Sequence, residues 1–172
     1  MSTQKQKILV AFFSHKGQNY SRGKIVDLAV GNTECAAQMI AKETNGDLFE
    51  IKSCEDYPFS YRECVTKAKE ELRANSRPEL ATDADVSSYD VIFLGYPNWC
   101  GTMPMPVWTF LESHNFSGKI ICPFCTHEGS GMGRSEDDLK KICPSADIRP
   151  GLAIYGSEVQ NAGSSIRAFI NF

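Results

Sequence analysis

Five short apolar runs, separated by amphipathic segments, set the pattern of this chain. The runs at 7–13, 89–95 and 118–125 are mostly apolar, which is typical of strands buried on both faces of a sheet. The run at 47–51 alternates apolar and polar residues, as a more peripheral strand does. A fifth run follows at 151–156. We therefore expect five strands.

The segments between these runs have helical periodicity and helix-ending residues. The segment Thr33–Thr44 predicts a helix with Asn32 or Thr33 as its cap and Asn45-Gly46 as its stop. The segment 61–75 predicts an amphipathic helix. Further helices are predicted at 106–114, 135–143 and 162–172.

The alternation of strands and helices predicts the fold class. Right-handed crossovers between such elements give an α/β fold, a doubly wound open sheet of five parallel strands with helices on both faces. No composition shift divides the chain, so we expect one domain over residues 1–172. One connection departs from the pattern: residues 15–30 form a loop several times longer than usual between a strand and a helix.

Composition and charge narrow the functional class. The net charge of −3 argues against a nucleic-acid binder, which would carry a basic stripe. No window approaches the roughly 20 apolar residues of a membrane span, and the first ten residues do not resemble a signal peptide. The seven cysteines have no disulfide-scaffold spacing. We expect a cytoplasmic protein with reduced thiols and no membrane partner.

Three loops are expected to meet at one edge of the sheet. All strands of a parallel sheet end at the same edge, and ligands bind there where the strand order reverses. The first loop offers hydroxyls, amides and the N–H groups of a helix start, which suit a phosphate or form an ordinary helix cap. It contains no GxGxxG or GxxxxGK[ST] and no lysine at the helix start, which favours a monophosphate held by neutral donors.

The second and third loops offer an aromatic ring and open backbone. Trp99 supplies a face for a planar ring, and Gly101 permits unusual backbone conformations. Cys100 has no neighbouring base in sequence and is expected to be a packing residue. Three glycines in 129–133 leave N–H groups open to a polar heterocycle. A phosphate site beside an aromatic wall and a glycine-rich loop predicts FMN as the cofactor.

The two tryptophans are expected to have different surroundings. Trp108 shares a face of its predicted helix with Val107 and Leu111, which predicts a packed position in the core. Trp99 lies in a loop, where we expect only a bound ligand to give its ring a flat partner.

Three motifs carry a resemblance to a known family. They are "VGNTE" at the first predicted helix, "GYPNWCGTMPMPVWTFLE" after the third strand and "PFCTHEGSGMGRS" after the fourth. With them the chain resembles the flavodoxin-like family from Ile8 to Phe172, above all the short bacterial flavodoxins. The resemblance implies the strand order 2-1-3-4-5, with FMN at the switch point between the first and third strands.

The resemblance also implies cofactor-binding residues. Residues 15–30 depart from the family, which reaches the helix soon after the first Ser, so Gln18-Asn19 and Asn32-Thr33 compete as phosphate donors. We favour Asn32-Thr33, because the helix begins there. The implied phosphate residues are Ser14, Asn32 and Thr33, with Gly17 and Asn19 beside them. The implied flavin neighbours are Pro97, Asn98, Trp99, Cys100 and Gly101 on one side and Thr126, His127, Ser130 and Gly131 on the other.

The function implied by the resemblance is low-potential electron transfer by bound FMN between redox partner proteins, a reductase and an acceptor. No side chain acts as acid or base, no metal is needed, and a backbone group near Gly101 is expected to rotate toward the flavin N5. The main alternative is an NAD(P)H- or quinone-dependent FMN oxidoreductase of the same fold, with residues 15–30 as a lid.

Three further alternatives remain at this point. Cys122 and Cys125 have the CxxC spacing of a thiol–disulfide site, although Cys122 lies in a predicted strand rather than at a helix start. The same pair with His127 has the residue types of a zinc site. A flavin-free signalling domain of this architecture would need an acidic cluster at the strand ends, which is not evident.

Overall fold

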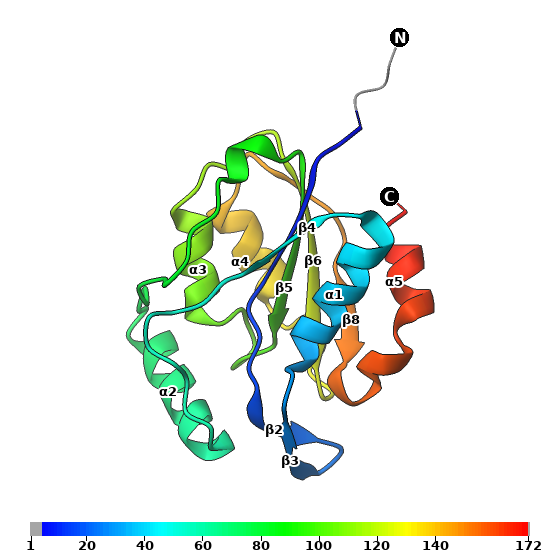
Figure 1. Cartoon of the computed structure of the whole chain (residues 1–172). Helices are drawn as coiled ribbons and strands as arrows, with labels where there is room; N and C mark the ends of the chain where they lie inside the picture. Colours follow the sequence, from blue (N-terminus) through cyan, green and yellow to red (C-terminus); the bar gives the residue numbers. More distant parts are fainter. Residues whose placement is uncertain (1–4, 172) are drawn as a thin grey trace.

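A parallel sheet forms the centre of the molecule in the computed structural model, which describes residues 5–171 (Figure 1). β1 pairs with β4 on one side and β5 on the other, and β6 pairs next to β5. β7 and β8 pair with successive parts of β6, so together they form one interrupted edge strand. The strands are β1 (Ile8–Phe12), β4 (Asp47–Glu50), β5 (Val91–Pro97), β6 (Ile120–His127), β7 (Asp147–Ile148) and β8 (Leu152–Tyr155).

This pairing confirms the predicted fold class and the strand order 2-1-3-4-5. The predicted fifth strand is longer than expected, because the chain already pairs with β6 at Asp147, before Pro150 and Gly151. Proline lacks the N–H that a strand donates to its neighbour, which accounts for a break at this point.

Helices cover both faces of the sheet, as predicted. α1 and α5 lie on one face, and α3 and α4 lie on the other (Figure 1). Alternate residues of β1 point to opposite cores: Leu9 belongs to the core that includes Phe110 of α3, and Val10 to the core that includes Ile40 of α1. The helices are α1 (Asn32–Thr44), α2 (Tyr61–Arg73), α3 (Met105–Glu112), α4 (Ser135–Ile142) and α5 (Gly163–Phe169), with 3₁₀ turns η1 (Val86–Ser88) and η2 (Gly156–Asn161).

The chain ends limit two of the predictions. The closing helix was predicted to reach Phe172, which lies outside the described residues, and α5 ends at Phe169. Residues 1–4, part of the segment compared with a signal peptide, also lie outside them. Within residues 5–171, no helix is long and apolar enough to span a membrane.

The long connection at 15–30 is not the loop that we expected. It is an antiparallel hairpin of β2 (Gly17–Ser21) and β3 (Lys24–Leu28), which projects beyond the carboxyl ends of the central strands (Figure 1). A β carbon placed on Gly31 would lie 2.1 Å from the Ser14 Oγ, so the chain leaves and returns at almost the same point. The hairpin is therefore an insertion that leaves the start of α1 next to the end of β1.

The cap of α1 also differs from the prediction. Gly31, with extended backbone, occupies the N-cap position, rather than Asn32 or Thr33. The missing side-chain cap comes from outside the helix, because the Ser14 Oγ accepts a hydrogen bond from the Glu34 N–H at 3.1 Å. This contact ties the end of β1 to the first turn of α1.

α2 has an unusual place for a helix of a doubly wound fold. Its packing partners are β2 of the hairpin and α3, and it stands apart from the sheet in Figure 1. Its buried residues, Cys64 and Ala68, belong to neither of the two cores that flank the sheet. This position leaves space between α2 and the carboxyl ends of the strands.

Candidate functional site

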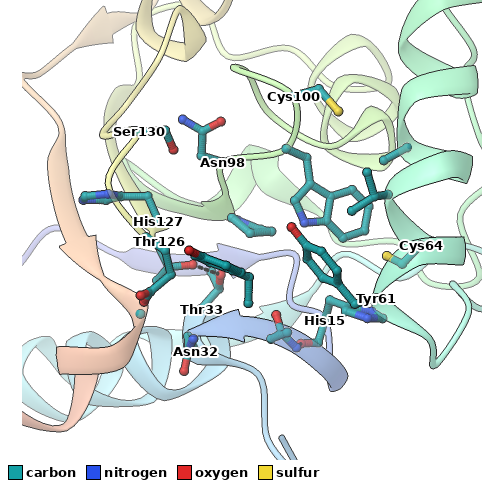
Figure 2. A pocket seen from close by; sticks show the side chains of 18 of the residues that line it. His15, Asn32, Thr33, Tyr61, Cys64, Asn98, Cys100, Thr126, His127 and Ser130 are labelled. Atoms are coloured by element: carbon teal, nitrogen blue, oxygen red, sulfur yellow. Dashed lines mark hydrogen bonds between the residues drawn. The ribbon is translucent and has the colours of Figure 1, made fainter. Parts of the chain in front are cut away.

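A cavity of about 460 Å³ lies at the carboxyl end of the sheet, between α2, the hairpin and the start of α1 (Figure 2). This volume is in the usual range for small-molecule and cofactor sites. Most of the residues predicted to bind a cofactor line it. They are Asn19, Asn32, Thr33, Pro97, Asn98, Trp99, Cys100, Thr126, His127 and Ser130.

Four predicted residues, Ser14, Gly17, Gly101 and Gly131, do not line the cavity. Ser14 caps α1, and Gly17 opens β2 with a φ of 101°. Gly101 and Gly131 are joined through one side chain: the Asn98 Oδ1 accepts from the Gly101 N–H at 3.0 Å, and the Asn98 Nδ2 donates to the Gly131 carbonyl at 2.8 Å. Asn98 thus holds the second and third loops together.

One end of the cavity offers neutral hydrogen-bond donors. The Thr33 and Thr126 hydroxyls lie 2.7 Å apart, and the Thr33 side chain is only 1% exposed (Figure 2). The N–H groups of Asn32 and Thr33 open α1 and have no acceptor within the described part of the chain. Free N–H groups at a helix N-terminus, together with hydroxyls, are suited to an anion.

The loop that carries Trp99 is a tight two-residue turn. Trp99 and Thr102 exchange backbone hydrogen bonds at 3.0 and 3.2 Å, and both Cys100 and Gly101 have positive φ, as in a type I′ turn. The Thr102 hydroxyl donates to the buried Asp138 Oδ2 at 2.6 Å. These contacts hold the turn in place beside α4.

Trp99 has aromatic neighbours within the protein itself. Phe13, His15 and Tyr57 meet it edge-on, with ring centroids at 5.1, 5.9 and 4.9 Å. None of these three rings stacks flat on the indole, so the expectation that a bound ligand supplies its flat partner stays a prediction. These rings hold the indole in position, and Trp99 still lines the cavity.

Sequence reasoning missed a second wall of the cavity. It consists of residues of the hairpin segment and of one face of α2, where 61, 64, 65 and 68 have helical spacing. That spacing was visible in the sequence, but it did not say that the face borders a cavity. The missed lining residues are His15, Tyr20, Tyr61, Cys64, Val65, Ala68, Lys69, Glu128 and Gly156, whereas Gln18, weighed with Asn19 as a phosphate donor, also lines the cavity.

The surroundings of two histidines in the cavity lower their pKa and so favour the neutral rings. Burial lowers the pKa of His15, and its buried Nε2 has no hydrogen-bond partner among residues 5–171. Burial also lowers the pKa of His127, against a smaller opposing effect of Glu128. The His127 Nδ1 accepts from the Gly129 N–H at 2.9 Å, which fits a neutral ring.

The CxxC pair has none of the features of a redox-active dithiol. Cys122 and Cys125 are fully buried in β6, and burial raises the pKa of each thiol to about 12. All seven cysteines of the chain are free. The structure therefore gives no support to a thiol–disulfide or zinc function at this pair.

Comparison with solved structures finds the same fold in several bacterial proteins. A protein described as a putative flavoprotein from Bacteroides eggerthii DSM 20697 is 28% identical, with a TM-score of 0.72 over 94% of this chain and 98% of that one. A similarly described protein from Bacteroides uniformis ATCC 8492 is 25% identical, with a TM-score of 0.74 over 95% and 99%.

A flavoprotein from Lactobacillus acidophilus NCFM, solved in complex with FMN, has the same fold at 22% identity, with a TM-score of 0.66 over 91% of this chain and 97% of that one. The comparison with curated proteins gave no match. The flavodoxin family matches residues 7–167, nearly the whole sequence. The chain therefore belongs to the flavodoxin family.

Proposed function

We propose that this chain binds FMN and works as a low-potential electron carrier between redox partner proteins. One observation carries the proposal: free N–H groups of α1 and a fixed indole border the same cavity. Family membership supports it, and so does the related fold that was solved with FMN. Bound FMN supplies one- and two-electron transfer through its ring system.

The residues of the cavity divide into two roles in this proposal. Asn32 and Thr33 bind the phosphate through their backbone N–H groups, and Thr33 adds its hydroxyl. Trp99 stacks on the flavin ring, and His127 and Ser130, which also line the cavity, border the ring as well. The walls of the cavity would shield the ring from water, and the carrier role requires that one edge of the ring stays open to a partner.

The peptide between Cys100 and Gly101 is the backbone group best placed to respond to reduction of the flavin. Its N–H now donates to the Asn98 Oδ1, so a rotation toward the flavin must exchange that bond for one to the cofactor. Gly101 tolerates both signs of φ, which keeps the rotation inexpensive.

The first test is direct identification of the cofactor. The purified protein should be yellow, and the released cofactor should co-migrate with FMN in chromatography. A colourless protein that takes up no FMN on addition would contradict the proposal.

Thr33→Val is expected to weaken FMN binding by about 1–3 kcal/mol, the cost of leaving a charged acceptor short of a hydrogen bond. Riboflavin, which lacks the phosphate, should bind the wild-type protein much more weakly than FMN does. Fluorescence titrations with both flavins measure these affinities. Equal affinities for FMN and riboflavin would mean that the phosphate site lies elsewhere.

A second candidate function is an NAD(P)H- or quinone-dependent FMN oxidoreductase. The wall formed by His15 and α2 favours it, because a carrier needs an exposed flavin edge whereas a reductase needs an enclosed pocket over the ring. The unpartnered His15 Nε2 would offer such a pocket a hydrogen-bonding group. Rapid bleaching of the bound flavin by NADPH alone would favour the oxidoreductase, and an unchanged spectrum would favour the carrier.

The cellular setting belongs to the same proposal. Seven free cysteines, four of them buried, fit a reducing compartment, and we place the protein in the cytoplasm on that ground. A reductase and an acceptor protein would supply and remove the electrons there. Recovery of the protein from the fraction of an oxidising compartment, or disulfides in the isolated protein, would argue against this placement.

A further inference from the structure

A carboxylate lies beside the donors that we assign to the phosphate. Glu128 lines the cavity, and its Oε1 accepts from the Ser157 N–H at 2.6 Å. A β carbon placed on Gly156 would lie 2.4 Å from the Asn32 Nδ2 and 3.2 Å from the same Glu128 oxygen, so the amide and the carboxylate are neighbours. A phosphate dianion at the start of α1 would be repelled by this charge.

The backbone of a cationic residue is fixed to that carboxylate. Arg22, at the tip of the inserted hairpin, donates its backbone N–H to the Glu128 Oε2 at 3.1 Å. Its guanidinium pairs with Glu158 in η2, which packs against α1. The hairpin tip thus spans from the first loop to the third loop and η2, at the phosphate end of the cavity.

The residue type at this tip is unusual for its backbone. Arg22 and Gly23 form the two-residue turn between β2 and β3 with φ of 49° and 82°, where Asn or Asp normally precedes glycine. A large side chain with positive φ is disfavoured, and such residues cluster at functional sites. The turn therefore keeps an arginine at the hairpin tip in spite of an unfavourable backbone conformation.

We propose that Arg22 is a phosphate-binding residue for FMN, carried to the site by the inserted hairpin. On FMN binding its guanidinium leaves Glu158 and pairs with the phosphate, which also offsets the charge of Glu128. This assignment rests on the proposed FMN function, and it supplies a cation to a helix start that has no lysine of its own. It makes the hairpin part of the phosphate site.

The test compares Arg22→Gln with Lys24→Gln by FMN and riboflavin titration at low ionic strength. Both variants remove one positive charge from the hairpin, but Lys24 makes no ion pair within residues 5–171. Arg22→Gln should weaken FMN binding by roughly five- to tenfold and leave riboflavin unchanged. Lys24→Gln should change neither affinity appreciably, and the effect of Arg22→Gln should shrink as salt is added.

Glu158→Gln separates phosphate binding from simple fastening of the hairpin. If Arg22 pairs with the phosphate, loss of its competitor Glu158 should tighten FMN binding, and this gain should disappear in the Arg22→Gln background. Weaker FMN binding by Glu158→Gln would overturn the proposal, because it would show that the ion pair only holds the hairpin. A gain in affinity that persists in the Arg22→Gln background would mean that Glu158 acts only through its general negative charge, and this result would also overturn the proposal.

These outcomes are distinguishable from failure of the proposed function. A wild-type protein that binds no FMN, or binds FMN and riboflavin equally, overturns the phosphate site and with it the role of Arg22. A normal preference for FMN, combined with equal effects of Arg22→Gln and Lys24→Gln, overturns the role of Arg22 alone.

Discussion

Gly133→Ala is expected to destabilise the protein by about 2–4 kcal/mol and to weaken FMN binding with it. Gly133 has a φ of 55°, and a β carbon there would lie 2.3 Å from the Gly101 carbonyl oxygen and 2.8 Å from its carbon. That neighbour is backbone and belongs to the turn that carries Trp99, so it cannot yield like a flexible side chain. The substitution must push the second and third loops apart.

Gly118→Ala is the matched control for this experiment. Gly118 has a φ of 73°, yet nothing lies within 4 Å of its β-carbon position, and it precedes β6 at the opposite end of the strand from the cavity. It should lose only about 1 kcal/mol from backbone strain and keep its FMN affinity. Thermal unfolding and FMN titration of both variants decide the matter. Equal losses of stability would mean that the contact with Gly101 is unimportant.

The strand order and the two layers of helices could be predicted because their signals are local. An apolar run such as Val91–Leu94 needs cover on both faces, and the helical segments between the runs supply it. The residues that cap the helices were harder to predict. α1 is capped by Ser14, which lies 20 positions before Glu34, so the helix sequence itself contains no sign of this cap.

The hairpin escaped prediction because its strands lack a buried face. No residue of β3 is buried, and its apolar residues do not alternate strictly with polar ones, so its sequence has no period-two apolar signal. Its turn, Arg22-Gly23, is also not one of the usual hairpin sequences. What stabilises it is distant in sequence: the Gln18 N–H donates to the Phe59 carbonyl at 2.9 Å, and Arg22 reaches Glu128.

The candidate site also has a part that could be predicted from the sequence and a part that could not. The three loops at the sheet edge could be brought together from the sequence, because parallel strands must end side by side. The wall from α2 could not, because amphipathic spacing predicts a buried face without naming what the face covers. Glu128 and its contacts with Arg22 and Ser157 likewise depend on tertiary placement alone.

Trp99→Ala should loosen FMN by about ten- to a hundredfold, since stacking on a planar heterocycle is worth roughly 1–3 kcal/mol by truncation. The structure adds a second effect. Because Trp99 meets Phe13, His15 and Tyr57 edge-on, its removal should also cost the protein about 1–2 kcal/mol of stability.

Trp108→Ala should have the opposite balance. Trp108 packs against the core that contains Val107 and Leu111, as expected, although it is only partly buried. Its Nε1 donates to the Met103 carbonyl at 3.3 Å, and the Arg77 guanidinium lies over its ring. The partial exposure lowers the expected loss of stability to about 2–4 kcal/mol. FMN affinity should be nearly unchanged, because Trp108 does not line the cavity.

Unfolding of each variant without FMN, followed by FMN titration, separates the two roles. The decisive quantity is the ratio of the affinity loss to the stability loss, which should be large for Trp99→Ala and small for Trp108→Ala. Trp99→Phe, which keeps an aromatic face, should recover part of the affinity. If Trp99→Ala instead binds FMN like wild type and melts much earlier, the indole closes the end of the sheet, and the flavin ring must stack elsewhere in the cavity.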